Sequence, residues 1–301
     1  TRARVEAEAQ RRGYRPNTFA RRLKMGTIDA VGLVFPVRPA PLNNNVFLEM
    51  VGEISHELAR HDIDLLLIAD DEQADKHGYM RMVQGRRVDA LIVAHTLDDD
   101  PRLAQLQASG FPFLALGRSR LAQPYAWFDF DNYAGTCRAT RHLIQQGHQR
   151  IALLGENNNQ AFILQRRNGY LDALREAGLS DAWLRSVPAT RRGGYQATLE
   201  LLRLPELPTA IITDCNTHGD GAAMALAHLG RLTGDNRVAL VVYDGLPQDS
   251  IIETDVAAVI QSTRQGVGRQ IADMVRRLIA GEDLATLQVL WQPEFIPGET
   301  A

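Results

Sequence analysis

A glycine-acid pattern is the first group of residues in this 301-residue chain that could bind a cofactor. Gly219-Asp220-Gly221 follows a strand-like segment, Thr209–Thr213, and the next such segment ends at Asp244. A strand, a glycine turn and an acid after the next strand are typical of dinucleotide binding. The match is incomplete, because Met224 stands where a third small residue is needed and Asp214–His218 makes a long connection. A nucleotide-dependent enzyme therefore stays an alternative, which titration with NAD would test.

Histidines and paired carboxylates offer a second kind of chemistry. His56-Glu57 could begin a zinc-protease motif, but Arg60 occupies the position of the second histidine and His61 is one residue too far, which excludes that class. Asp129 and Asp131 lie two apart on an extended segment and share one face. Paired acids could transfer protons, bind sugar hydroxyls or cap the following helix.

Composition and cysteine usage exclude several protein classes. The chain is 45% hydrophobic and 23% charged, as globular proteins are, and no apolar run is long enough to cross a bilayer. Cys137 and Cys215 are far apart, which excludes a disulfide scaffold and suits a reducing cytoplasm. The chain begins at Thr1, inside a helical pattern, so we expect a piece of the N-terminus to be missing.

Charge is distributed unevenly along the chain. Residues 1–25 carry eight basic and two acidic side chains, a net +6, whereas the rest of the chain carries a net -9. A basic segment on an acidic body favours contact with a polyanion such as nucleic acid. A solvated basic helix without a partner is the alternative.

The elements that must position these residues alternate between strand and helix. The strands expected in the first half are Ala30–Pro36, Ile63–Ala69, Val88–Ala94 and Phe111–Leu116. Those expected in the second half are Arg150–Gly155, Ala182–Val187, Thr209–Thr213, Val238–Asp244, Ala257–Gln261 and Leu287–Gln292. Intervening helical segments predict an α/β fold of two doubly wound parallel-sheet lobes, with a ligand cleft at the carboxyl ends of the strands.

The order of several segments carries a resemblance to a known family. The chain opens with "TRARVEAEAQRRGYRPNTFARRLKMGTIDAVGLVFP" and continues with "RRVDALIVAH", "FPFLALGRS", "FDFDNYAGTCRATRHLIQQGHQRIALLG", "RRNGYLDALREAGL", "PTAI" and "YDG". In this order they resemble the lactose-repressor/galactose-repressor (LacI/GalR) family of bacterial transcription regulators. The resemblance implies the end of an all-α DNA-binding domain with its hinge helix at 1–26, then a core like type I periplasmic binding proteins. Its lobes would be 27–130 with 262–286, and 131–261 with 287–301.

The resemblance also implies how DNA is bound. Family members dimerise, and their paired hinge helices enter the minor groove of the operator, where a leucine wedges between base steps. The matching leucine is Leu23, with Asn17 as helix cap and Ala20 and Lys24 at or beside the groove-facing surface. The helices that read the major groove precede this point, so no residue of the chain is assigned to that role.

For the core, the resemblance implies a small molecule held between the lobes. The expected ligand-binding residues are Asn45, Phe47, His95, Arg118, Asp131, Arg166, Asn216 and Asp244. Arginine and carboxylate side chains form charge-assisted hydrogen bonds, and an aromatic face covers C–H groups, which suits a sugar. "CNTHGDGAA" and "QSTRQ" depart from the family pattern at the cleft and leave the identity of the sugar open.

These observations predict a cytoplasmic, homodimeric repressor of a carbohydrate operon whose sugar effector changes its affinity for DNA. We expect no catalytic residue, metal, cofactor or membrane partner. The alternative is a transport-type sugar receptor that never meets DNA. The basic segment containing Leu23 argues against that receptor, which has no use for a hinge helix.

Overall fold

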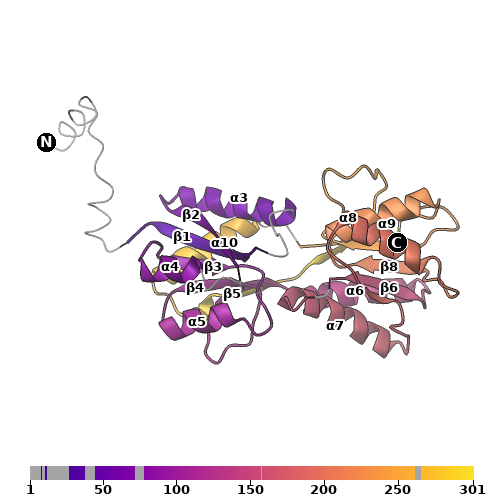
Figure 1. Cartoon of the computed structure of the whole chain (residues 1–301), viewed down its shortest axis with the longest axis horizontal. Coiled ribbons are helices and arrows are strands. Elements are labelled where there is room, and N and C mark those ends of the chain that lie inside the picture. Colours follow the sequence, from indigo (N-terminus) through magenta and orange to yellow (C-terminus); the bar gives the residue numbers. More distant parts are fainter. Residues whose placement is uncertain are drawn as a thin grey trace.

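The computed structural model describes residues 8, 11, 27–37, 45–71, 78–156, 158–261 and 266–301. Strands and helices form two lobes that lie side by side along the long axis of the molecule (Figure 1). Each lobe contains a six-stranded sheet. The structure therefore confirms the predicted pair of doubly wound α/β lobes.

The first lobe is built on parallel strands in the order β11-β5-β4-β3-β1-β2. Its strands are β1 (Ala30–Pro36), β2 (Asp64–Asp70), β3 (Ala90–Val93), β4 (Phe113–Leu116), β5 (Ala126–Phe130) and β11 (Gln288–Trp291). Its helices are α3 (Asn45–Ala59), α4 (Gly78–Gln84), α5 (Pro101–Ser109), α10 (Val267–Ile279) and the 3₁₀ turn η3 (Leu284–Thr286).

The second lobe has the order β12-β10-β9-β8-β6-β7. Its strands are β6 (Ile151–Gly155), β7 (Leu184–Ser186), β8 (Ala210–Thr213), β9 (Ala239–Tyr243), β10 (Ala257–Ile260) and β12 (Glu294–Ile296). Its helices are α6 (Asn132–Gln145), α7 (Ala161–Glu176), α8 (Arg191–Leu201) and α9 (Asn216–His228). All its strands pair in parallel except β12, an edge strand that runs antiparallel to β10 and was not expected from the sequence.

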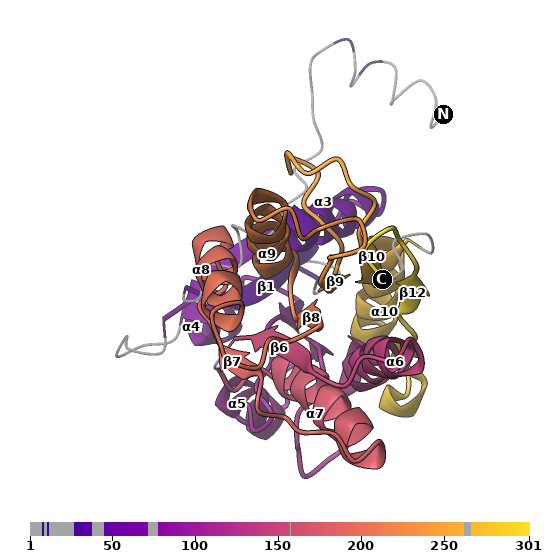
Figure 2. The same cartoon turned by 90° about the vertical axis from the view of Figure 1, so that its right-hand side faces the viewer.

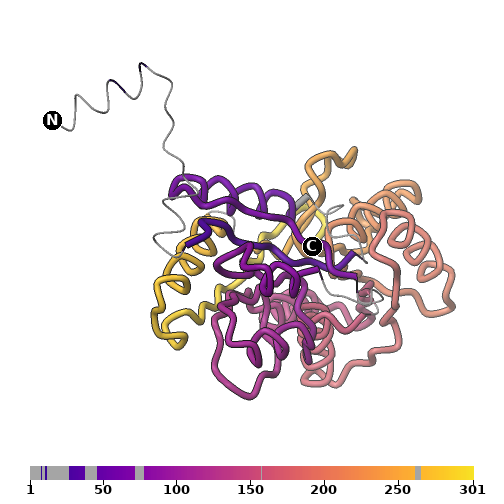
Figure 3. The backbone as a smooth tube through the Cα atoms, turned by 60° about the vertical axis from the view of Figure 1, so that its left-hand side comes forward, coloured from indigo at the N-terminus to yellow at the C-terminus, as the bar shows by residue number. Residues whose placement is uncertain are grey.

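Helices cover both faces of each sheet, which is why the central strands are apolar on both sides. In the first lobe α3 and α10 cover one face, although they are more than 200 residues apart in the chain (Figure 3). α4 and α5 cover the opposite face. In the second lobe α8 and α9 lie on one face, and α6 and α7 on the other (Figure 2).

Three connections join the lobes. The first follows Phe130, the second lies between β10 and α10, and the third lies between β11 and β12. The third differs from expectation, because we expected residues 287–301 to belong to the second lobe. Instead, β11 pairs in parallel with β5, with Gln288 opposite Trp127, before the chain crosses over. The alternation of a single strand does not reveal which sheet it will join.

Candidate functional site

Polar residues from both lobes meet where the strand ends of the two sheets face each other. His95 follows β3, Arg118 follows β4, and Asp244 directly follows β9. The lobes touch here through an isolated bridge between Leu97 and Gln160 and a hydrogen bond from the Ala161 nitrogen to the Thr96 carbonyl oxygen at 2.8 Å. The interlobe strand ends are thus where a ligand would contact both lobes at once.

Arg166 lies at the centre of the residues that the second lobe contributes to this region. It projects from α7, is only 2% exposed, and its Nε donates to Asn132 Oδ1 at 2.8 Å. Its Nη1 donates to the Asp214 carbonyl oxygen, and its Nη2 lies 3.8 Å from Asp244 Oδ2. The guanidinium also sits 3.5 Å from the centre of the Tyr243 ring. The predicted site residues Arg166 and Asp244 are therefore neighbours, and the arginine is already held by the protein.

Two buried side-chain oxygen atoms in this region have no hydrogen-bond partner within the described part of the chain. They are Asp244 Oδ1 and Asn216 Oδ1, the latter two residues after the Asp214 carbonyl that accepts from Arg166. A buried polar atom without a hydrogen-bond partner lowers the free energy of unfolding by about 1–3 kcal/mol. We therefore expect these atoms to have a partner outside the chain. An amide oxygen and a carboxylate oxygen can only accept hydrogen bonds, and the hydroxyl groups of a polyol can donate them.

Backbone and electrostatic strain coincide at Asp244. Its φ of 67° lies in the left-handed region, which non-glycine residues seldom adopt and which functional sites often retain. Burial raises the pKa of the Asp244 carboxyl group, while Arg166 opposes this rise and Asp214 adds to it. A ligand hydroxyl that donates to Asp244 Oδ1 would stabilise the charged carboxylate.

A second arginine–carboxylate pair belongs to the first lobe. Arg118 Nε donates to Asp129 Oδ2 at 2.9 Å, and Arg118 Nη2 reaches Gln165 Oε1 of the other lobe at 3.4 Å. Burial raises the pKa of Asp129, and Arg118 opposes this effect. Arg118 thus links the two lobes and remains partly accessible, as a ligand contact requires.

Aromatic rings continue the region across the lobes. The rings of Phe47 and His95 lie edge to face with centres 5.0 Å apart, and His95 lies 5.9 Å from Phe162 of the second lobe. His95 also has a left-handed φ of 53°. Burial lowers the pKa of His95 to about 4, with a further lowering from Arg102, so the ring is neutral near pH 7.

Because His95 is neutral in the folded protein, we expect the free energy of unfolding to fall at acidic pH. Because its folded pKa lies below the ordinary 6.5, the unfolded chain binds the proton more tightly between these values. The contribution of His95 to stability is therefore present above pH 6.5 and lost as the pH falls toward 4, with a slope of up to about 1.4 kcal/mol per pH unit. We expect His95→Asn, which tolerates the left-handed backbone, to flatten this decline. Urea unfolding of both proteins at pH 7 and pH 5 measures it, and equal declines would contradict the assignment.

Asp131 lies at the edge of the region in a different role. One oxygen caps α6 by accepting from the Ala134 nitrogen at 3.0 Å, and the other accepts from Gln292 Nε2 at 3.1 Å. Of the alternatives for this acid, helix capping is the one the contacts display. Its role in ligand binding stays a prediction.

Several residues of this interlobe region were not among the predicted ligand-binding residues. Asn132 Oδ1 accepts from both Arg166 and Gln261, the latter at 3.2 Å, and so joins α7 to the second crossing. Tyr243 and Phe162 form the faces on which the Arg166 guanidinium lies. Asn132 lies just after a strand end, a signal that could have found it, and Gln261 begins the "QSTRQ" segment that the resemblance had placed at the cleft. Tyr243 is indistinguishable from other strand residues.

The glycine-acid pattern serves packing. Gly219 and Gly221 lie inside α9, which begins at Asn216, so they form no phosphate-binding turn. A side chain at Gly219 would overlap with Val242 of β9, and one at Gly221 with the Arg191 carbonyl oxygen of α8. Both glycines therefore permit close helix packing.

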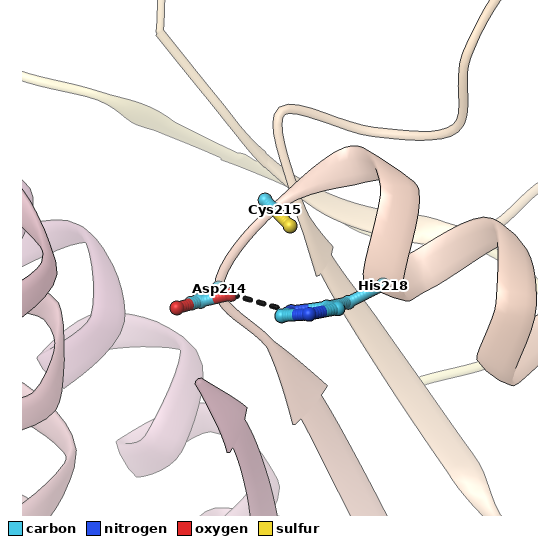
Figure 4. A group of neighbouring side chains, drawn as sticks. All are labelled: Asp214, Cys215 and His218. Carbon is cyan, nitrogen blue, oxygen red and sulfur yellow. Dashed lines mark hydrogen bonds and ion pairs between the residues drawn. The ribbon is translucent and has the colours of Figure 1, made fainter. Parts of the chain in front are cut away.

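One group among the described residues combines metal-ligand types. Oxygen, sulfur and nitrogen atoms of Asp214, Cys215 and His218 lie within 4.8 Å of one another (Figure 4). However, His218 Nδ1 lies 2.8 Å from Asp214 Oδ1, and His218 Nε2 lies 2.7 Å from the Pro188 carbonyl oxygen. Both ring nitrogens thus have protein partners, and we assign no metal here.

The remaining predicted residues lie wholly or partly outside the residues that the structure describes. Asn17, Ala20, Leu23 and Lys24 lie outside the described residues, as does the side chain of Asn45, whose backbone begins α3. Glu8 and Arg11 are described as helical and form an ion pair at 2.8 Å. Within the described part of the chain, every helix is too short or too polar to span a membrane.

Comparison with known proteins matches this architecture to one family. Residues 28–296 match the family model described as periplasmic binding proteins and sugar binding domain of LacI family. A crystal structure of a transcriptional regulator from Yersinia pestis biovar Microtus str. 91001 superposes with a TM-score of 0.86 at 49% identity, over 91% of this chain and 98% of that one.

Two curated relatives match nearly the whole chain. The HTH-type transcriptional regulator RafR of Escherichia coli is 64% identical over 300 residues, covering 100% of this chain and 89% of the relative. The HTH-type transcriptional regulator AglR of Rhizobium meliloti (strain 1021) is 31% identical, covering 98% of this chain and 84% of the relative. Both are transcriptional regulators rather than transport receptors. The chain therefore belongs to the LacI family of transcriptional regulators.

Proposed function

We propose that this regulator is a cytoplasmic repressor of a carbohydrate operon, and that it binds a neutral sugar between its lobes. The single observation that carries the sugar assignment is that two buried oxygens at the interlobe strand ends, Asn216 Oδ1 and Asp244 Oδ1, have no hydrogen-bond partner among the described residues. The two arginines of the region are each paired with an aspartate, which leaves little uncompensated positive charge for a phosphorylated ligand.

Binding is coupled to DNA through the arrangement of the lobes. A sugar that contacts Asp244 in one lobe and Arg118 in the other favours one interlobe angle over another. The effector can shift this equilibrium only by its difference in affinity for the two arrangements. In a homodimer, the shift changes the spacing of the paired hinge helices and with it the affinity for operator DNA.

A thermal-shift screen tests the sugar assignment. Binding to the folded state raises the melting temperature by mass action, so a panel of mono- and disaccharides at millimolar concentration should contain at least one stabilising compound. Phosphorylated sugars and purine bases form the control arms. A shift from those compounds alone would exclude a neutral sugar as the effector.

Leu23 is the proposed minor-groove wedge. In the regulator bound to its operator, we expect Leu23→Ala to reduce DNA bending, because the wedge between base steps is lost. Sugar binding in the distant core should be unchanged. Gel-shift bending assays beside calorimetric sugar titrations measure both properties, and unaltered bending by the variant would contradict the hinge-helix assignment.

A further inference from the structure

His218 is a buried histidine whose two ring nitrogens both face acceptors. It lies in the first turn of α9 and is 0% exposed. Nδ1 lies 2.8 Å from Asp214 Oδ1 (Figure 4), and Nε2 lies 2.7 Å from the Pro188 carbonyl oxygen. A neutral imidazole carries one N–H and can satisfy only one of these acceptors. The protonated ring, with two N–H groups, satisfies both.

The surroundings of the ring favour the charged form. Asp214 and Cys215 face it from the connection between β8 and α9, Glu156 faces it from the end of β6, and Pro188 from the segment before α8. Burial by itself lowers the pKa of His218, whereas Cys215 and Asp214 raise it above its ordinary value. Helix α8 packs closely against the first turn of α9 at Gly194, where any side chain would overlap with the His218 carbonyl oxygen.

Asp214 connects this histidine to the candidate site. Its Oδ2 accepts from the Glu156 nitrogen at 2.7 Å, and its carbonyl oxygen accepts from Arg166 Nη1. Two residues later stands Asn216, with its unpaired buried oxygen. The carboxylate therefore fixes the connection that carries Asn216 and whose carbonyl oxygen accepts a hydrogen bond from Arg166.

We propose that His218 is a positioning residue of the effector site: a buried imidazolium ion that clamps the Asp214 carboxylate and thereby holds Arg166 and Asn216 in binding geometry. This inference rests on the proposed effector site for its purpose. The charge on the ring and the clamp are measurable without any sugar.

The alternative is that the same side chains bind a metal ion. Zinc could be held by Cys215 Sγ, Asp214 Oδ1 and an unprotonated His218 Nδ1, with Nε2–H donating to Pro188 as ligating histidines often do. That arrangement needs a neutral ring, so the protonation state separates the two.

Nuclear magnetic resonance of the histidine rings at pH 7.5 is the first test. We expect His218 to show protons on both nitrogens and no titration between pH 6 and 9. His95 and His148, whose pKa values are lowered mainly by burial, serve as internal controls and should carry one ring proton each. A single ring proton on His218 would overturn the proposal. So would stoichiometric binding of Co²⁺ or Zn²⁺ that Cys215→Ser abolishes.

A pair of variants tests the clamp. In His218→Gln, an amide oxygen must face either Asp214 or the Pro188 carbonyl, so one contact becomes repulsive. In the double variant Asp214→Asn/His218→Gln, both amides can turn so that Glu156, the two side chains and Pro188 all keep hydrogen bonds. We expect the Glu156 amide proton to exchange at least about tenfold faster in the single variant and to recover in the double variant. Equal exchange in all three proteins would exclude a clamping role.

The outcomes separate this inference from the proposed function. Titration with the sugars that stabilise the wild type should show affinity at least about tenfold weaker for His218→Gln, with recovery in the double variant. Unchanged affinity would remove His218 as a positioning residue and leave the sugar assignment intact. If no sugar of the panel binds the wild type, the function fails, while ring protonation and amide exchange still decide the clamp.

Discussion

Replacing Arg166 with alanine is expected to lower the free energy of unfolding by about 3–5 kcal/mol, because it leaves a buried carboxylate without its cation. Asp244 lies 3.8 Å from the guanidinium and has few other ways to compensate its charge. The same variant strips Asn132 and the Asp214 carbonyl of a donor. Sugar binding should be abolished, since the geometry of the second-lobe side depends on this one side chain.

Urea denaturation and calorimetry measure the two effects separately. Arg167→Ala is the matched control, because the neighbouring arginine on α7 is exposed, and it should change stability by less than about 0.5 kcal/mol. Adding Asp244→Asn to Arg166→Ala should recover part of the lost stability, since no charge is then left uncompensated. A fully stable Arg166→Ala protein would show that the buried pair is not the centre of this region.

Gly221→Ala is expected to be the second large effect, a loss of about 3 kcal/mol of stability through overpacking. The added carbon would overlap with the Arg191 carbonyl oxygen and lie 2.7 Å from the Tyr195 nitrogen, both backbone atoms of α8. Backbone cannot rotate away as a side chain can, so α8 and α9 must separate. Because α9 begins at Asn216, the separation also displaces a candidate ligand contact.

Gly52→Ala provides the contrast for this prediction. Gly52 lies in the interior of α3 with nothing within 4 Å of an added carbon. Alanine there should raise stability by about 0.5–1 kcal/mol, because glycine loses more backbone entropy on forming a helix. Thermal unfolding of both variants measures the difference in sign. A neutral Gly221→Ala would show that the two helices can move apart freely.

The fold class and several strand-end residues could be read from local pattern. Short apolar runs such as Ala210–Thr213, separated by amphipathic helices, predict parallel strands buried on both faces, and they are buried on both faces. Asp244 and Arg118 could be placed at strand ends for the same reason, because a strand ends where its apolar run ends. Membership of the family followed from the order of segments along the chain and is confirmed by comparison.

The contacts between segments that lie far apart in the chain could be identified only from the tertiary structure. The β11 strand joins β5 rather than the second sheet, and Asn132 bonds to Arg166 and Gln261, which come from other elements. Such contacts depend on how whole sheets and helices stack, information that no single segment contains.

The sequence by itself determined that this protein has two α/β lobes, a basic N-terminal segment and polar residues at the ends of its strands, because hydrophobic periodicity and charge are local properties. Only the tertiary structure decided which contacts the described residues among them make. Gly219 and Gly221, which suggest a nucleotide turn, serve helix packing, and Asp131 caps a helix. His218 is one of eight histidines in the sequence, and it is distinguished only by the Asp214 carboxylate and the Pro188 carbonyl that fold onto its two nitrogens. Hydrogen-bond partners and burial set the charge of a side chain, and both are fixed only when distant parts of the chain pack together.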